Sequence, residues 1–126
     1  MVVHGKAPEG LGDLEGPVME ALWERGALST PEVHEVVGKP RGLAYTTILT
    51  TLQRLHKKGL LERVDSGRGH RYAPAQSRES FIAGRAQQLA ARLMQLGDPG
   101  VAAFLSEAGR LDPDVVAKLR ERLGQP

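Results

Sequence analysis

The stretch that most constrains the fold runs over residues 43–74, because its apolar spacing changes from that of a helix to that of two strands. Within residues 44–58, Ile48, Leu52 and Leu55 recur at helical intervals. Two strand candidates, residues 60–64 and 70–73, then flank a short Gly-containing turn, DSGRG. A strong helix followed at once by a hairpin predicts a reading helix with a β-wing.

The preceding segments supply the other parts of a winged helix. Asp13 is expected to cap a first helix that ends at Gly26. A token strand at residues 27–29 leads to the sequence STPE, a hydroxyl cap with proline at the first helical position, which predicts a second helix. The order helix, short strand, helix, helix, hairpin predicts a winged helix-turn-helix over residues 13–75, after a flexible arm at residues 1–12.

Residues 76–126 are predicted to form a helical dimerisation domain. Amphipathic helices are expected at residues 77–96, at residues 101–108 and after Asp112, with the sequence GDPG breaking the first. Helices this short cannot easily bury their apolar stripes alone, so they either fold back on the first domain or meet a second copy of the chain, and we favour a homodimer. The fold class is therefore mainly α with a small β-hairpin. The predicted dimerisation residues are Ile82, Leu89, Leu93, Leu96, Phe104, Leu105, Val116, Leu119 and Leu123.

Positive charge is concentrated on the predicted reading segment. Residues 1–38 carry two basic and seven acidic side chains, a net charge of −5, whereas residues 39–71 carry eight basic and two acidic ones, a net charge of +6. Residues 72–126 have a net charge of +1. Lysine and arginine displace the counterions that surround nucleic-acid phosphates, so this distribution predicts a double-stranded DNA partner.

The predicted DNA contacts lie at the start of the reading helix, on the cations that follow it and on the wing. Threonine hydroxyls and methyl groups suit base edges, a tyrosine hydroxyl reaches a phosphate, and a wing arginine suits a phosphate or the minor groove. For any single threonine, plain solvent exposure is an equally good explanation. The predicted residues are Tyr45, Thr46, Thr47, Leu49, Thr50, Arg54, Lys57, Lys58, Arg68 and Arg71.

Several classes of function find no support in the residues. Cysteine is absent, and the four histidines lack the spacing of metal ligands, so neither a metal site nor a cofactor is predicted. No nucleophile–base pair or carboxylate dyad is recognisable, which argues against an enzyme. No apolar run is long enough to span a membrane and the N-terminus lacks a secretory core, so the expected location is the cytoplasm.

From about residue 11 to residue 123 the chain resembles the β-lactamase (penicillinase) repressor family, which includes the methicillin-resistance repressor and a copper-responsive branch. The segments that carry the resemblance are LGDLEGPVMEALW, AYTTILTTLQRLHKKGLLER and GRGHRYAP. It implies a repressor that binds inverted-repeat operators of the TACA…TGTA type as a homodimer. The family's reading positions correspond to Thr46, Thr47, Leu49 and Thr50, and its wing to Arg68.

Two family features are missing. In the antibiotic-responsive branch an Asn-Phe bond is cleaved, and the resemblance places the corresponding bond at Phe104–Leu105, which makes these residues the candidate regulatory cleavage site. Because the asparagine is absent, the case for a sensor protease as partner is weakened. The copper branch senses metal through cysteines, which this chain lacks.

Two other interpretations remain open at this stage. The winged helix could serve as a protein-interaction module, with the reading helix packed on a partner protein. The chain could also be a small-molecule-responsive regulator that binds its ligand at the dimer interface, although the C-terminal stripes show no convergent polar cluster. A DNA affinity that falls strongly with salt would favour a repressor, whereas salt-insensitive binding to a protein, with none to duplex DNA, would favour a protein-interaction module.

Overall fold

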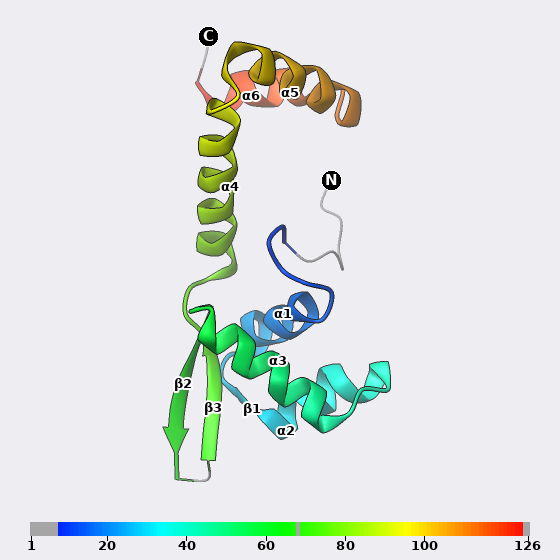
Figure 1. Ribbon diagram of the computed structural model, residues 1–126, viewed down its shortest axis with the longest axis vertical. Coiled ribbons are helices and arrows are strands. Elements are labelled where there is room, and N and C mark those ends of the chain that lie inside the picture. The colour runs from blue at the N-terminus through cyan, green and yellow to red at the C-terminus, as the bar shows by residue number, and fades with distance from the viewer. Residues whose placement is uncertain (1–7, 68, 125–126) are drawn as a thin grey trace. The chain divides into compact units, whose positions relative to one another are not determined.

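The computed structural model describes residues 8–67 and 69–124 (Figure 1). Their contacts divide the chain into two compact units, residues 1–85 and 86–126. The elements are α1 (Glu15–Arg25), β1 (Leu28–Ser29), α2 (Thr30–Val33), the π-helix η1 (His34–Gly38), the 3-10 helix η2 (Lys39–Arg41), α3 (Tyr45–Lys57), β2 (Leu61–Ser66), β3 (Gly69–Pro74), α4 (Arg78–Met94), α5 (Gly97–Leu111) and α6 (Val115–Arg122). The predicted fold class, mainly α with a small sheet, is confirmed.

The sheet is antiparallel, with β3 in the centre between β1 and β2. The register pairs Leu28 with Tyr72 on one side of β3 and Arg63 with Tyr72 on the other. The token strand at residues 28–29 is thereby tied to the hairpin that forms the predicted wing. Tyr72 is buried and lies edge-on to the ring of His56 near the end of α3, so the wing is anchored to the helix that precedes it.

The first unit has a continuous apolar core to which all three of its N-terminal helices and the sheet contribute. Its fully buried members come from α1, α2 and α3 at the spacing predicted for one helical face. The buried hydrophobic residues of this cluster are Val18, Met19, Leu22, Val33, Val37, Ile48, Leu52, Leu55, Leu61 and Tyr72.

The start of α4 belongs to this first unit. Phe81 is buried and its ring centroid lies 5.6 Å from that of Trp23 in α1. Trp23 also donates a hydrogen bond from Nε1 to the carbonyl of Gln76, at 3.0 Å. Arg78 lies over the Trp23 ring and pairs with Glu20. The domain boundary that the sequence suggested after residue 75 stays a prediction.

Two local predictions were wrong. Asp13 does not cap α1, because Leu14 occupies the N-cap without a side-chain hydrogen bond and the carboxylate of Glu15 accepts the backbone N–H of Gly12 instead. The predicted break after the first C-terminal helix is present, at residues 95–96, but the GDPG sequence that follows forms the first turn of α5, so this helix begins at Gly97 rather than at residue 101. Pro99 is tolerated there because the first helical turn has no intrahelical N–H bond to lose.

The predicted start of α2 is confirmed in detail. The hydroxyl of Ser29 accepts the N–H of Glu32, and the carboxylate of Glu32 accepts the N–H of Ser29, which makes a complete capping box. Within the part of the chain that the structure describes, no helix is long and apolar enough to cross a membrane.

Candidate nucleic-acid interface

The outer face of α3 is solvent-exposed and uncharged at its start. Ile48, Leu52 and Leu55 anchor the helix in the core. On the opposite side, Tyr45, Thr46, Thr47, Thr50 and Arg54 are exposed, and Leu49 is half-buried at the edge of the face. A helix that is apolar on its inner face, with hydroxyls and cations on its outer face, can offer hydrogen-bond donors and methyl groups to a macromolecular surface.

A shallow hollow of about 300 Å³ lies along one flank of α3, next to the start of α1. Thr51 is buried at this flank, and its hydroxyl donates to the Thr47 carbonyl at 2.9 Å, so this hydroxyl is already used within the helix. No acidic side chain is among the lining residues, which are Leu14, Thr46, Thr47, Thr50, Thr51 and Arg54.

His34 positions the start of α3, a role that the sequence analysis missed. Its Nε2–H donates to the carbonyl of Leu43 at 2.9 Å, and its ring lies edge-on to Tyr45 with centroids 5.8 Å apart. Gly38 leaves space for this ring, because a Cβ at that position would lie 2.4 Å from His34 Cδ2. The π-helical backbone of η1 brings residues 34 and 38 together, and no pattern of apolar residues signals such a π-turn.

Two of the predicted phosphate contacts are engaged within the chain. Lys58 Nζ lies 2.6 Å from Glu15 Oε2, and Arg71 lies 2.9 Å from Glu32 Oε1 while also donating to the Ala27 carbonyl. In contrast, the side chains of Arg54 and Lys57 form no hydrogen bond or ion pair with another described residue, although the charge of Arg54 acts on nearby Glu15. The cations of α3 thus divide into those committed to the fold and those available to a partner.

The Glu15 carboxylate is the charged group most tightly held in this region, with a side chain only 7% exposed. Burial by itself raises the pKa of Glu15, but the hydrogen bonds from Lys58 and from the Gly12 backbone, together with the charges of Lys58 and Arg54, lower it by more. The net pKa is therefore below the usual glutamate value. Glu15 stays ionised and keeps Lys58 beside α1.

The wing is described on both sides of its tip. Arg68, the predicted wing contact, lies outside the described residues. Asp65 and His70 face each other in the register of β2 and β3, and His70 Nδ1 lies 2.5 Å from Asp65 Oδ1. This pair closes the hairpin next to its turn, while Arg63 on β2 is exposed.

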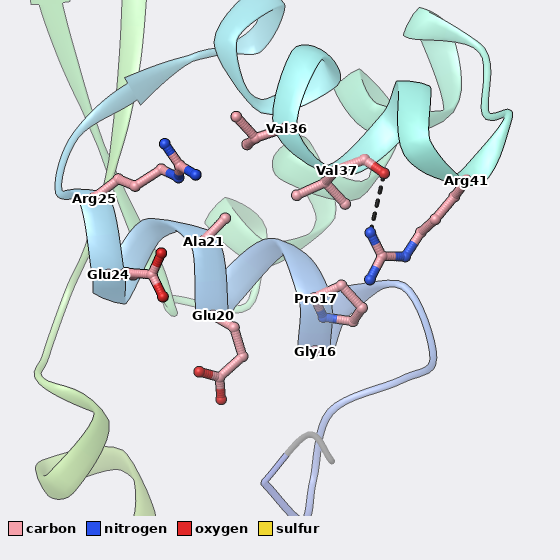
Figure 2. Close-up of a pocket in the computed structure, with 9 residues that line it drawn as sticks. All are labelled: Gly16, Pro17, Glu20, Ala21, Glu24, Arg25, Val36, Val37 and Arg41. Atoms are coloured by element: carbon pink, nitrogen blue, oxygen red, sulfur yellow. Dashed lines mark hydrogen bonds between the residues drawn. The ribbon is translucent and has the colours of Figure 1, made fainter. Parts of the chain in front are cut away.

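A second hollow, of about 250 Å³, lies between α1 and η1 (Figure 2). Figure 2 shows the guanidinium of Arg41 donating to the carbonyl of Val37, a bond of 3.2 Å, while Glu20 and Glu24 project from α1. Its lining includes two acidic and two basic side chains together with apolar ones. None of the residues predicted to contact DNA lines this hollow.

The second unit exposes most of its apolar residues. None of the described residues of α5 or α6 is buried. A hollow of about 760 Å³ lies between α4 and α5, with Arg92 as its only charged lining residue. Its apolar lining residues are Ala86, Leu89, Ala90, Leu93, Leu96 and Phe104. Four predicted dimerisation residues, Leu89, Leu93, Leu96 and Phe104, are among them.

A three-helix core with a β-wing, and an exposed polar helix between α2 and the wing, define the winged-helix class of transcriptional regulators. A model of the penicillinase repressor family matches residues 11–125, and the chain belongs to this family. It is accordingly a transcriptional regulator of the repressor type and not an enzyme, as the sequence predicted.

Named relatives agree with this assignment. The chain is 41% identical to the transcriptional regulator BlaI of Mycobacterium tuberculosis over 118 residues, which cover 91% of this chain and 83% of the relative. It is 34% identical to the penicillinase repressor of Bacillus licheniformis over 77 residues, 61% of this chain and 59% of that protein.

Two solved structures share the fold. The solution structure of the DNA-binding domain of the repressor BlaI is 34% identical, with a TM-score of 0.50, and the match covers 58% of this chain and 88% of that one. The crystal structure of a MarR family transcription regulator is 17% identical, with a TM-score of 0.50, and the match covers 93% of this chain and 77% of that one. The second likeness concerns the fold alone.

Proposed function

We propose that this chain represses transcription by binding double-stranded operator DNA as a homodimer, with α3 in the major groove of each half-site. The observation that carries the proposal is the outer face of α3. This face offers three exposed threonines, together with Arg54 and Lys57, from a helix whose inner face is locked in the core. Blocking of transcription by the bound dimer is the mechanism, and the bacterial cytoplasm is the expected location.

The relatives support the DNA part of the proposal. The similar solution structure is that of the DNA-binding domain of the repressor BlaI, and 88% of that domain is matched by this chain. The net charge of +6 over residues 39–71 supplies the electrostatic attraction that a duplex requires.

The exposed apolar residues of the second unit support a homodimer. A monomer would leave Leu89, Leu96, Phe104 and Leu119 each at least 40% exposed. Contiguous apolar surface of this kind marks an association site, and a two-fold dimer matches the symmetry of an inverted repeat. The apolar hollow beside Phe104 gives a second copy a place to insert side chains.

Relief of repression by a sensor protease stays a prediction. The bond between Phe104 and Leu105 lies in the interior of α5, and both side chains are nearly half exposed. Cleavage there would cut the predicted dimer surface. Incubation of the chain with a family sensor protease, followed by mass spectrometry of the fragments, tests this bond directly.

Fluorescence anisotropy tests the central proposal. The full chain is titrated into a TACA…TGTA inverted-repeat duplex and into a scrambled duplex, at low and at physiological salt. We expect a preference of at least about 10³-fold for the repeat, and an affinity that falls steeply with salt. Equal, salt-dependent binding to both duplexes would retain DNA binding but reject this operator. Absence of binding to either would favour a protein-interaction module.

Sedimentation velocity tests the dimer. Leu93→Asp places a charge in the apolar stripe of α4 and is expected to weaken self-association by more than about tenfold, because the carboxylate would be desolvated without a partner. Gln87→Asp, at an exposed position of the same helix, is the matched control. Equal behaviour of the two variants would place the dimer contact elsewhere.

A further inference from the structure

Two adjacent stripes of residues run along α3 and carry its threonines, Arg54 and Lys57. Residues spaced four, three and four apart lie above one another on a helix, so positions 46, 50, 53 and 57 form one stripe and positions 47, 51, 54 and 58 form the next. All four side chains of the first stripe are exposed. In the second stripe Thr51 is buried and Lys58 is paired with Glu15.

The second stripe faces the start of α1. Leu14 lines the hollow together with Thr47, Thr51 and Arg54, and the ion pair between Glu15 and Lys58 links the same two helices one turn further along. The first stripe is exposed along its whole length, although its Thr46 and Thr50 also border the hollow, while the second stripe lies in the angle between α3 and α1. If α3 enters the major groove, its outward stripe meets base edges and its flank meets the backbone at the edge of the groove.

The chemistry of the hollow matches a phosphate better than a base edge. Its available polar groups are the hydroxyls of three threonines and the guanidinium of Arg54, all able to donate. Arg54 has no ion-pair partner among the described residues. The nearby carboxylate of Glu15 is turned to Gly12 and Lys58, each of which takes one of its oxygens, so it does not line the hollow.

We propose that this hollow seats one backbone phosphate of each half-site, held by the Arg54 guanidinium and the Thr47 hydroxyl, with the methyl groups of Leu14 forming its wall. The proposal rests on the proposed DNA-binding function and refines it. Thr46 and Thr50 border the same hollow from the fully exposed stripe, and we assign their side chains to base edges rather than to this phosphate. Lys58 has a different part: it neutralises Glu15, which would otherwise repel the phosphate seated next to it.

Single methylphosphonate substitutions test the site, because each removes the charge of one phosphate and leaves the bases unchanged. Duplexes that carry one such substitution at successive positions are titrated with the full chain and with Arg54→Gln. We expect Arg54→Gln to bind both unmodified duplexes, the repeat and the scrambled one, about tenfold more weakly than the wild type does. The slope of its log affinity against log salt concentration should be smaller by about one. At only one phosphate of each half-site should the methylphosphonate weaken DNA binding by the wild type and leave the affinity of Arg54→Gln unchanged.

Two further variants keep the test decisive. Arg120→Gln, which removes an exposed cation from α6, should bind like the wild type and shows that loss of one positive charge is not enough. Thr47→Val keeps the shape of the side chain, and its affinity for DNA should fall about threefold. A methylphosphonate at the same phosphate should then weaken binding by this variant less than it weakens binding by the wild type. This second readout remains available if Arg54→Gln fails to fold.

The outcomes separate the two proposals. If the wild type binds DNA but Arg54→Gln and Thr47→Val stay as sensitive as the wild type at every phosphate, the phosphate seat is overturned while the repressor function stands. The same conclusion follows if the loss in Arg54→Gln is confined to one base pair, since that is the behaviour of a base contact. If the wild type binds no duplex, both proposals fail.

Discussion

The two units of this chain solve the problem of apolar burial differently. The first unit packs ten buried hydrophobic side chains from three helices and a sheet into one cluster, whereas the described residues of α5 and α6 contribute none. Both regions have amphipathic helices of similar length. Amphipathic helices therefore form a core only when they pack against further apolar surface. In the first unit the other helices and the sheet provide that surface, whereas the second unit requires apolar surface from outside itself.

The largest effect should come from a core leucine of the first unit. Leu52→Ala leaves a cavity beneath the reading helix and is expected to lower the free energy of unfolding by about 2–5 kcal/mol. The single tryptophan, Trp23, lies in the first unit, so urea unfolding followed by its fluorescence reports this unit.

The counterpart in the second unit is Leu93→Ala, which removes the same atoms from a half-buried position. It should leave the Trp23 transition unchanged within about 0.5 kcal/mol and lower only the affinity of self-association. A loss of unfolding free energy equal to that of Leu52→Ala would show that the two units share one core, and would contradict the contrast drawn between them.

A somewhat smaller effect should locate the end of the first unit. A fragment of residues 1–75 lacks Phe81 and exposes the Trp23 ring, so it should unfold with about 2–3 kcal/mol less free energy than a fragment of residues 1–85. Phe81→Ala in the full chain is the matched point substitution and should show a similar loss. Equal stability of the two fragments would instead support a boundary after residue 75.

The smallest effect concerns the tie between α1 and α3. The folded pKa of Glu15 lies below its ordinary value of 4.5, so its stabilisation is complete above that pH and is lost as pH falls through the folded pKa. The Glu15→Gln variant should be about 1 kcal/mol less stable near neutral pH and show a flatter decline in acid. Urea unfolding from pH 6 to pH 3 measures both quantities.

The control for this titration is Glu24→Gln, in the same helix but at an exposed position whose side chain makes no hydrogen bond to any residue that the structure describes. It should follow the wild-type pH profile. If both variants flatten the profile equally, the acid sensitivity comes from net charge and not from the ion pair with Lys58.

Local patterns were sufficient for most of the secondary structure. The helical spacing of Ile48, Leu52 and Leu55, the Ser29 capping box and the glycine that follows α3 each act within a few residues. The predictions that failed, the Asp13 cap and the start of a helix at residue 101, concern helix ends, where a neighbouring side chain or a shift of one turn changes the outcome.

The class of this protein follows from the sequence alone, because the order of its helices and hairpin, the cluster of cations and the family segments are all properties of the linear chain. Which cations near the end of α3 are available to a partner depends on tertiary packing. Lys58 and Arg54 are cations of one helical stripe, yet Lys58 is bound to Glu15 and Arg54 lines a hollow. The cause is that Glu15, 43 residues before Lys58, lies where the start of α1 packs against α3, and the spacing of residues along the chain does not reveal that contact.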